Sequence, residues 1–291
     1  MQALGAQLAR QQDLGHRGLG DSLGRQLPGL FLLEEVLQAR AAQPLPRDVW
    51  LPQIQVMAAR DRGGTAAGLY VAAKGGHNAE SHNHNDVGHF VVYRDGRPVI
   101  VDAGVEAYTA KTFSSRRYEI WTMQSAYHSL PTIGGVMQAA GAQYAARQVA
   151  YQATAGEARF ELDLAGAFPP EAGLQRWQRR IVLRRGQEVE VGEEFTLERP
   201  VEQIRLSLLT PCPVEVAGEG VLRLLERELA PDRWTGSLRL SYPAGRLQAS
   251  VEEMPLDDPG MARTWGGRLW RILLCAPGPA GQGSWTLRLA P

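Results

Sequence analysis

From Pro52 onward the sequence consists of short segments in which apolar and polar residues alternate, separated by Gly, Pro, Asp or Asn. A period of two is typical of strands that bury one face, and little helical pattern lies among these segments. The chain is therefore expected to be mostly β, an antiparallel multi-strand β-sandwich or stacked sheets. The clearest segments are 53–59, 68–74, 89–94, 98–104, 143–154, 158–164, 179–185, 188–197, 202–209, 237–242, 246–254, 268–276 and 284–290.

The N-terminal part has a different pattern, which predicts one amphipathic helix over residues 27–43. Leu33 and Leu37 share a face of this helix with other apolar residues, and Pro44 and Pro46 end it. We therefore expect a helical segment, residues 1–46, preceding a β-sandwich domain, residues 47–291. One helix cannot bury its own apolar stripe, so it packs on the β-domain or is the remnant of a larger helical domain.

Composition excludes several classes of protein. The 31 basic and 31 acidic residues cancel, which gives no argument for nucleic acid or for an anionic membrane surface. No window reaches the roughly 18 apolar residues of a membrane span. The N-terminus has no apolar signal core, so no secretory leader is expected and the compartment stays open. Because Cys212 and Cys275 are the only cysteines, any metal would take nitrogen and oxygen ligands.

Five of the six histidines fall between positions 77 and 128. His82 and His84 lie two residues apart at the predicted start of the strand 89–94, so we expect their side chains on one face. Asp102 ends the next strand of a hairpin, which places it at the same end of the sheet. His128, in the irregular stretch 104–142, could supply a third ligand.

Two histidines and a carboxylate form an ordinary divalent cation site, with zinc favoured over manganese. Asp102 could instead be only a turn residue before Gly104. His89 is expected to be a core or capping residue without a role in the site, and Asp86 to support it by hydrogen bonds. A cupin also mounts His-x-His on a β-scaffold, but positions 88 and 89 lack its glutamate.

The long irregular stretch also holds Arg116, Arg117 and Tyr118. Arginine forks bind carboxylates or sulfates, and a tyrosine beside cations can donate or accept a proton. These three residues are therefore candidates for substrate binding and proton transfer. Tyr108 and Tyr127, in the same stretch, are expected only to pack on the sheet.

Two motifs carry a family resemblance: SHNHNDVGHFVVYRDGRPVIVDAGVEAY (81–108) and RRYEIWTMQSAYHSLPTIGG (116–135). In order, spacing and β-context they resemble the C-terminal portion of heparinase II/III-type polysaccharide lyases, over about residues 50–138. The resemblance implies an N-terminal α/α toroid, antiparallel β-sheet layers after it, and an acidic polysaccharide bound in the cleft between them.

The implied reaction is β-elimination at a uronic acid. The resemblance makes His84, Asp102 and His128 the metal ligands. His82 would face the cleft and assist charge neutralisation or proton transfer, and Tyr118 would be a catalytic acid or a substrate contact. The metal would organise the site.

This chain departs from the family pattern because it lacks the toroid, of which residues 27–43 would be the last helix. A toroid domain or chain would have to complete the cleft, and weak or no lyase activity is expected from this chain alone. The alternative is a non-catalytic carbohydrate-binding or interaction β-sandwich with a structural metal site.

Overall fold

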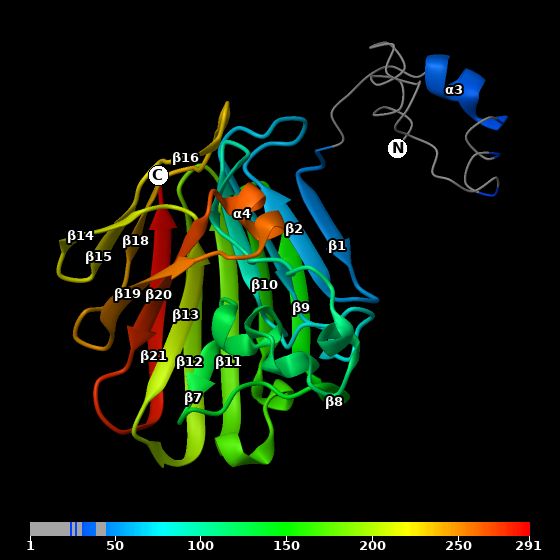
Figure 1. Cartoon of the computed structure of the whole chain (residues 1–291). Coiled ribbons are helices and arrows are strands. Elements are labelled where there is room, and N and C mark those ends of the chain that lie inside the picture. The colour runs from blue at the N-terminus through cyan, green and yellow to red at the C-terminus, as the bar shows by residue number, and fades with distance from the viewer. Residues whose placement is uncertain (1–23, 25–26, 28–30, 39–44) are drawn as a thin grey trace. The chain divides into compact units, whose positions relative to one another are not determined.

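The structure is a computed structural model that describes residues 24, 27, 31–38 and 45–291 (Figure 1). The chain divides into two compact units, residues 1–47 with 62–66, and residues 48–61 with 67–291. In the first unit, helix α3 (Leu33–Gln38) lies inside the predicted helix 27–43, part of which falls outside the described residues. The division at residue 46 and the toroid origin of this segment remain predictions. Among the described residues, no helix has the length and apolar character needed to span a membrane.

The second unit is built from antiparallel sheets. The five-stranded sheet contains, in order, β1 (Asp48–Leu51), β2 (Val56–Arg60), β3 (Leu69–Lys74), β5 (Phe90–Arg94) and β6 (Arg97–Ile100). The eight-stranded sheet contains β14 (Val214–Gly218), β15 (Val221–Leu224), β18 (Leu238–Ser241), β21 (Ala280–Ala290), β12 (Glu188–Val201), β11 (Leu174–Arg184), β10 (Glu157–Asp163) and β9 (Arg147–Ala153). The four-stranded sheet contains β19 (Gln248–Pro255), β20 (Arg268–Cys275), β13 (Ile204–Thr210) and β7 (Pro131–Ile133). Two small pairs are β16 (Glu228–Ala230) with β17 (Arg233–Trp234), and β4 (His77–Asn78) with β8 (Gly141–Ala145).

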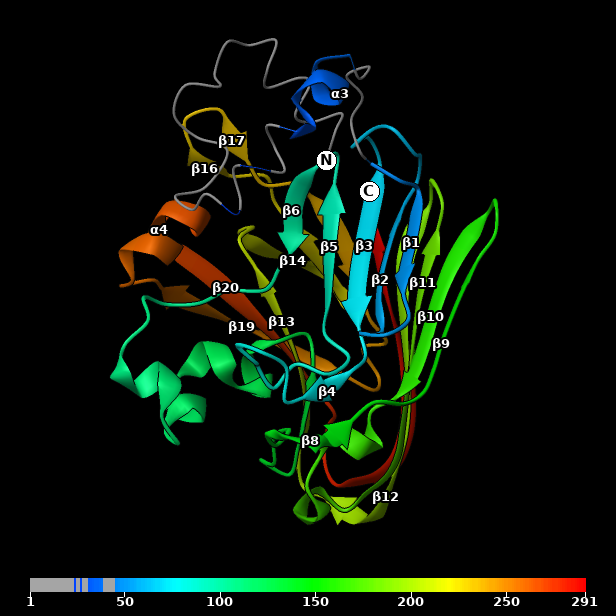
Figure 2. The ribbon, with the colours of Figure 1, turned by 90° about the vertical axis from the view of Figure 1, so that its right-hand side faces the viewer.

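The five-stranded sheet faces the eight-stranded sheet, with β3 packed on β11 and β12 (Figure 2). Side chains from both sheets, among them Phe90, Val92, Phe160 and Ile181, are buried in one core. The chain leaving β6 continues onto the four-stranded sheet, because the amide of Val101 donates to the carbonyl of Leu209 at 3.0 Å. The predicted antiparallel β-sandwich is therefore confirmed.

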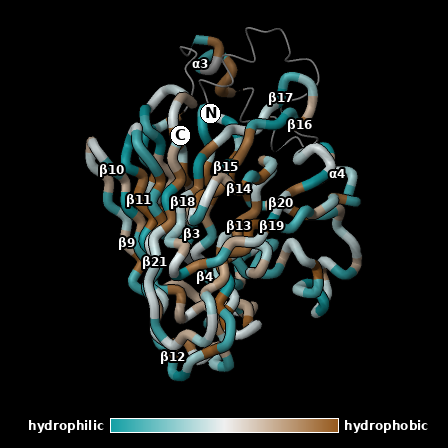
Figure 3. Tube along the Cα trace, turned by 90° about the vertical axis from the view of Figure 1, so that its left-hand side faces the viewer, coloured by the Kyte–Doolittle hydropathy of each residue, from teal (hydrophilic) through white to brown (hydrophobic). Residues whose placement is uncertain are grey.

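The alternation of the sequence explains these sheets. In β3, buried and half-buried residues alternate along the strand. The same change between apolar and polar residues is visible along the strands of the eight-stranded sheet (Figure 3). Asp95 and Gly96, with φ of 52° and 75°, form the turn between β5 and β6. Both positions need positive φ, which glycine and aspartate tolerate better than most residues.

The stretch 104–142 is irregular as predicted up to residue 130, but it then contains the short strand β7 and the start of β8. Four short 3₁₀ turns lie within it: η2 (Ala110–Phe113), η3 (Arg117–Glu119), η4 (Trp121–Met123) and η5 (Ser125–Tyr127). Helix α4 (Pro259–Trp265) was not predicted. The side chain of Asp258 caps its N-terminus by accepting from the amide of Met261, and Gly266, at φ 69°, ends it.

Candidate metal centre

Three side chains from different segments converge at one end of the five-stranded sheet. His84 comes from the loop before β5, Asp102 lies two residues after β6, and His128 directly follows η5. One ligand atom from each residue lies within 4.8 Å of those of the other two. His128 is only 1% exposed, and its Nδ1 is 3.1 Å from Oδ2 of Asp102. The structure thus brings together the three residues that the sequence selected.

The backbone around Asp102 and His128 fixes their positions. Oδ1 of Asp102 accepts from the amide of Gly104 at 2.6 Å, so this carboxylate also closes a turn. Its other oxygen remains directed at His128. Downstream of His128, the carbonyl of Leu130 accepts from the amide of Ser207 at 3.1 Å, and β7 then pairs with β13. The four-stranded sheet therefore anchors the segment that carries His128.

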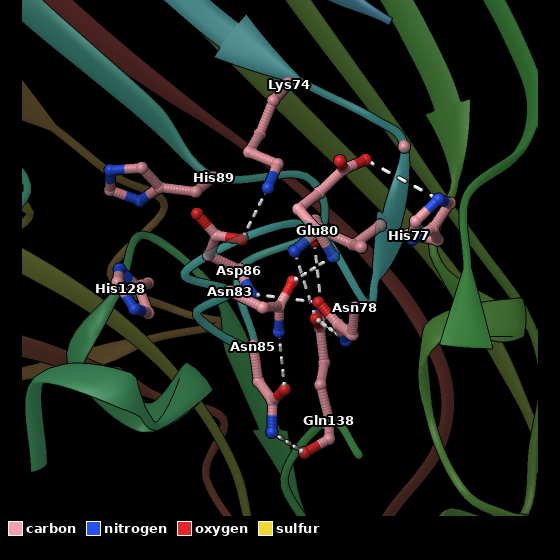
Figure 4. A network of polar contacts seen from close by, with 12 residues as sticks. Lys74, His77, Asn78, Glu80, Asn83, Asn85, Asp86, His89, His128 and Gln138 are labelled. Atoms are coloured by element: carbon pink, nitrogen blue, oxygen red, sulfur yellow. Dashed lines mark hydrogen bonds and ion pairs between the residues drawn. The ribbon is translucent and has the colours of Figure 1, made fainter. Parts of the chain in front are cut away.

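A network of amide side chains holds the loop that carries His84 (Figure 4). Asn83 donates to Asn85 at 3.3 Å, and Asn85 donates to the carbonyl of Gln138 at 3.2 Å. The side chain of Gln138 in turn bonds both the amide and the carbonyl of Val87. Lys74 and Asp86 form an ion pair at 2.7 Å at the edge of the network. The loop is fixed by buried hydrogen bonds in place of a β-ladder, so its shape is well defined.

The expectation that His82 and His84 share one face of a strand is wrong. Strand β5 begins only at Phe90, and His82 lies in a turn at φ 59°. Its exposed ring stacks on Tyr108 with centroids 5.7 Å apart, whereas the ring of His84 lies 5.4 Å from that of His128. The rule of alternating faces holds only where the backbone is extended, and here a turn separates the two imidazoles.

Burial and charge act in opposite directions on the pKa values of the cluster. Burial would raise the pKa of Asp102, but the imidazoles of His128, His89 and His84 hold it well below its usual range. Burial lowers the pKa of His84, which favours the neutral ring that a metal ligand needs. Burial also opposes charge on His128, yet the adjacent Asp102 carboxylate outweighs it and raises the pKa of His128.

His89 is a member of this cluster that the sequence placed in the core without a role. It is 6% exposed, as a core residue would be, but its Nε2 lies 3.6 Å from Oδ2 of Asp102. Its Nδ1 accepts from the amide of Ser129 at 2.9 Å, so the ring proton sits on Nε2 and is directed at Asp102. Burial lowers the pKa of His89 to about 4, so the ring stays neutral at pH 7. We name His84, His89, Asp102 and His128 the histidine cluster.

The histidine cluster fits a divalent cation. Among the described residues, Nε2 of His128 and Nε2 of His89 are buried without a hydrogen-bond partner, and Nδ1 of His128 has only the Asp102 carboxylate, 3.1 Å away. Unpartnered buried nitrogens are costly unless a ligand satisfies them. Nitrogen and oxygen ligands about 2.0–2.1 Å from zinc lie about 3.3 Å from one another, and the three ligand atoms here lie within 4.8 Å of one another, so binding would draw them together by up to about 1.5 Å. His84, Asp102 and His128 would be the ligands. His89 would orient the ligand carboxylate, since its other nitrogen is already engaged.

Beside the cluster lies a hollow of about 640 Å³. Residues from the His84 loop and from η2 and η3 line it, among them His82, Asn83, Phe113, Arg117 and Tyr118. The hydroxyl of Tyr118 accepts from the side chain of Asn83 at 3.1 Å, which ties it to the loop before His84. The two residues predicted to act on substrate, His82 and Tyr118, thus face one hollow.

The two predicted substrate-binding arginines lie in different surroundings. Arg117 lines the hollow and donates to the carbonyls of Asn83 and Thr112, at 2.9 and 2.8 Å. Arg116 is outside the lining and forms a bidentate pair with the exposed Glu119, with its Nη2 2.9 Å from Oε2. Their role in substrate binding remains a prediction, and of the two Arg117 is the better placed.

Of the two tyrosines expected to pack on the sheet, Tyr127 does pack: its ring lies under the guanidinium of Arg271, with 4.4 Å to the centroid. For Tyr108 the expectation is wrong. Tyr108 is 49% exposed and places its hydroxyl 3.3 Å from Nδ1 of His82. Phe113, 67% exposed, meets both rings edge-on. The loop projects these aromatic side chains away from the sheet, so strand alternation does not control them.

Comparison with solved structures shows that this fold is shared with part of the chains of heparan sulfate lyase and heparinase III structures. The heparan sulfate lyase HepC from Pedobacter heparinus matches with a TM-score of 0.68 at 16% identity, over 100% of this chain and 41% of that one. Two heparinase III structures match with TM-scores of 0.66 and 0.64, at 11% and 14% identity. They cover 92% and 87% of this chain, which spans 39% and 38% of theirs. No curated protein matches the chain by sequence.

The family model of the heparinase II/III-like C-terminal domain matches residues 43–240. The chain therefore belongs to the heparinase II/III-like family, through its C-terminal domain, as the two motifs predicted. The chain spans about two fifths of the length of the solved lyases that it resembles.

Proposed function

We propose that this chain is the metal-bearing β-domain of a lyase that cleaves uronic-acid-containing polysaccharide, of the glycosaminoglycan or alginate type, by β-elimination. The observation that carries the proposal is the convergence of His84, Asp102 and His128 beside a hollow lined by His82 and Tyr118. A purely structural cation site would not need additional polar side chains around an adjoining hollow.

The chemistry assigns roles to the residues of the hollow. β-Elimination transfers the C5 proton of a uronate to a base, while the uronate carboxylate is neutralised and an acid protonates the leaving C4 oxygen. His82 is exposed at the hollow and assists neutralisation or proton transfer. Tyr118 protonates the leaving oxygen or contacts the sugar, and Arg117 attracts carboxylates or sulfates. The cation, zinc or manganese, holds the loops that carry these residues in position.

The chain is proposed to form one wall of the cleft. Because it spans about two fifths of the lyases that it resembles, a toroid domain or a toroid-bearing chain is proposed to supply the opposite wall. The purified chain alone is then expected to release little or no unsaturated product from heparan sulfate, chondroitin sulfate or alginate. Strong ultraviolet absorbance from such product would refute this requirement for a second wall.

Metal analysis of the purified chain tests the cation site directly. After dialysis against equal concentrations of zinc and manganese, we expect about one cation per chain, and zinc above manganese. His84→Ala and Asp102→Asn are expected to lose it, whereas His77→Ala, outside the cluster, should retain it. A chain that binds no cation under these conditions would contradict the proposed site.

A second test separates the lyase from a carbohydrate-binding module with a structural metal. His82→Ala is introduced into the full-length protein to which this chain belongs, and both its lyase turnover and its metal content are measured. A lyase role predicts loss of turnover with the metal retained, because His82 lines the hollow and is not a proposed ligand. Unchanged turnover would remove the catalytic assignment of His82 and favour the binding module.

A further inference from the structure

A buried arginine on the opposite sheet contacts both loops of the histidine cluster. Arg179, on β11, is 0% exposed. Its Nη1 donates to the carbonyl of Gly88 at 2.7 Å and to that of Ser129 at 2.6 Å. Gly88 directly precedes His89, and Ser129 directly follows His128. One nitrogen therefore joins two segments that lie 91 and 50 residues away from it in the sequence.

The rest of the guanidinium is held just as firmly. Arg179 and Glu193 are cross-strand partners on β11 and β12, and Nε and Nη2 donate to Oε1 of Glu193 at 2.9 and 2.6 Å. The other carboxylate oxygen accepts from the indole of Trp177 at 2.7 Å. We call Arg179 and Glu193 the core ion pair. It is rigid because each partner is fixed by several bonds.

The loop packs closely against Leu164, next to β10, because residue 88 is glycine. Gly88 has φ of 87°, and a Cβ at this position would clash with Cδ2 of Leu164. A second link runs between the two segments themselves, since the hydroxyl of Ser129 donates to the carbonyl of Phe90 at 3.0 Å. The separation of the segments is therefore set by contacts on both sides.

Stability alone does not account for a charged pair in this core. For the two charges themselves, apolar residues of similar volume are often equally stabilising or better. Such residues could not donate to two backbone carbonyls. The function that only the charged fork performs is to fix the carbonyls beside His89 and His128.

We propose that Arg179 is a positioning residue for the metal centre: from the eight-stranded sheet it sets where His89 and His128 stand relative to Asp102. This inference rests on the proposed metal site. When the guanidinium is removed, the segments that carry His89 and His128 are free to separate. The cation is then bound more weakly, although all its ligands are present.

The test compares Arg179→Met, Arg179→Lys and the double variant Arg179→Met/Glu193→Leu with the unaltered chain. Urea unfolding of the metal-free protein and zinc affinity against a competing chelator are measured for each. The double variant removes both charges and is therefore expected to lose less stability than Arg179→Met, although the carbonyls of Gly88 and Ser129 and the indole of Trp177 lose their partners. It is expected to bind zinc about 10- to 100-fold more weakly than the unaltered chain. Arg179→Lys keeps the positive charge but lacks the planar guanidinium, so its zinc affinity is expected to lie between those of the double variant and the unaltered chain.

Arg227→Met is the matched control. Arg227 also donates to backbone carbonyls, those of Trp265 (2.5 Å) and Arg268 (3.1 Å), but around α4. This variant is expected to change the unfolding midpoint and leave zinc affinity unchanged. If the double variant is more stable than Arg179→Met and also binds zinc as tightly as the unaltered chain, Arg179 is only a packing residue and the proposal is overturned.

Hydrogen exchange gives a readout that does not depend on metal. In the double variant the amides of His89 and Ser129 are expected to exchange faster, while those of β10 and β21 keep their protection. If the unaltered chain binds no zinc, the proposed metal site fails, and faster exchange still supports the positioning contact. Unchanged exchange at both amides would overturn the positioning role independently.

Discussion

Two polar clusters lie in the same sandwich, one fully buried and one partly buried, and they differ in how well their atoms are satisfied. In the core ion pair, Arg179 and Glu193 bond each other, an indole and two backbone carbonyls. In the histidine cluster, Nε2 of His128 has no partner in the part of the chain that the structure describes, and its Nδ1 has only the Asp102 carboxylate, 3.1 Å away. A satisfied buried network needs nothing further, whereas orphaned nitrogens facing a carboxylate indicate a place for a ligand. Burial of polar groups alone therefore does not identify a functional site; here unmet bonding capacity coincides with ligand atoms that converge on one point.

The largest expected effect separates the two clusters by stability. Glu193→Leu leaves the buried Arg179 charge without its carboxylate and should lower the free energy of unfolding by about 3–5 kcal/mol. Asp102→Asn should cost clearly less in the metal-free chain, because His128 can lose its proton when the carboxylate charge is removed. Urea unfolding with a chelator present measures both. Equal losses of unfolding free energy in the two variants would show that the core ion pair and the histidine cluster contribute equally to stability.

Metal binding is expected to depend on pH through the histidine cluster. The pKa of His128 is raised by Asp102, so a proton occupies this ring at mildly acidic pH and the cation must displace it. Affinity should then fall as the pH drops below neutral, by at most about tenfold per pH unit for one displaced proton. Calorimetric titration in buffers of different ionisation enthalpy should count about one released proton at pH 6. An affinity that is flat below neutral pH would contradict the paired state of Asp102 and His128.

The role of His89 can be tested with two replacements that differ in hydrogen bonding. His89→Leu removes the group directed at Asp102 and should weaken zinc binding about 10- to 100-fold. His89→Gln can still accept from Ser129 and donate toward the carboxylate, so its affinity should stay closer to that of the unaltered chain. Competition titration against a chelator compares them. Equal losses in both would mean that only the ring itself is needed.

The smallest effect is expected at Arg116, whose exposed side chain pairs with Glu119. Arg116→Ala should leave the unfolding midpoint and zinc affinity unchanged, because surface ion pairs contribute little. Arg117→Ala should change binding of an acidic oligosaccharide more than Arg116→Ala does, since Arg117 lines the hollow. Titration of both variants with the oligosaccharide measures the two affinities. A larger loss of affinity for Arg116→Ala would show that Arg116, and not Arg117, is the main substrate-binding arginine.

Much of the fold could be predicted from the sequence because its strands carry a local signal. The alternating segments predicted β2, β3, β5, β6 and most strands of the large sheet. Helix α4 was missed although Asp258 and Gly266 are ordinary start and stop signals, because only seven residues separate them and the surroundings are β. The hairpin of β14 and β15 was missed because its strands have five and four residues.

The candidate site was predictable only in part, for a related reason. The spacing of the motif and the family resemblance selected His84, Asp102 and His128. The parts played by His89 and Arg179 depend on contacts across 40 to 91 residues and between facing sheets. No local sequence pattern predicts such contacts. The shared strand face for His82 and His84 failed because the sequence does not reveal where a turn replaces extended backbone.

Asp102 lies just beyond β6, where the chain passes from the five-stranded to the four-stranded sheet, and His128 lies just before β7. A cation held there would cross-link segments as far apart as residues 84 and 128. Cys212 and Cys275 are both free thiols, so the ion would take the place that a disulfide has in other small β-domains. Chelators would then destabilise the fold of this domain, much as reducing agents destabilise disulfide-linked domains, whether or not the cation takes part in a reaction.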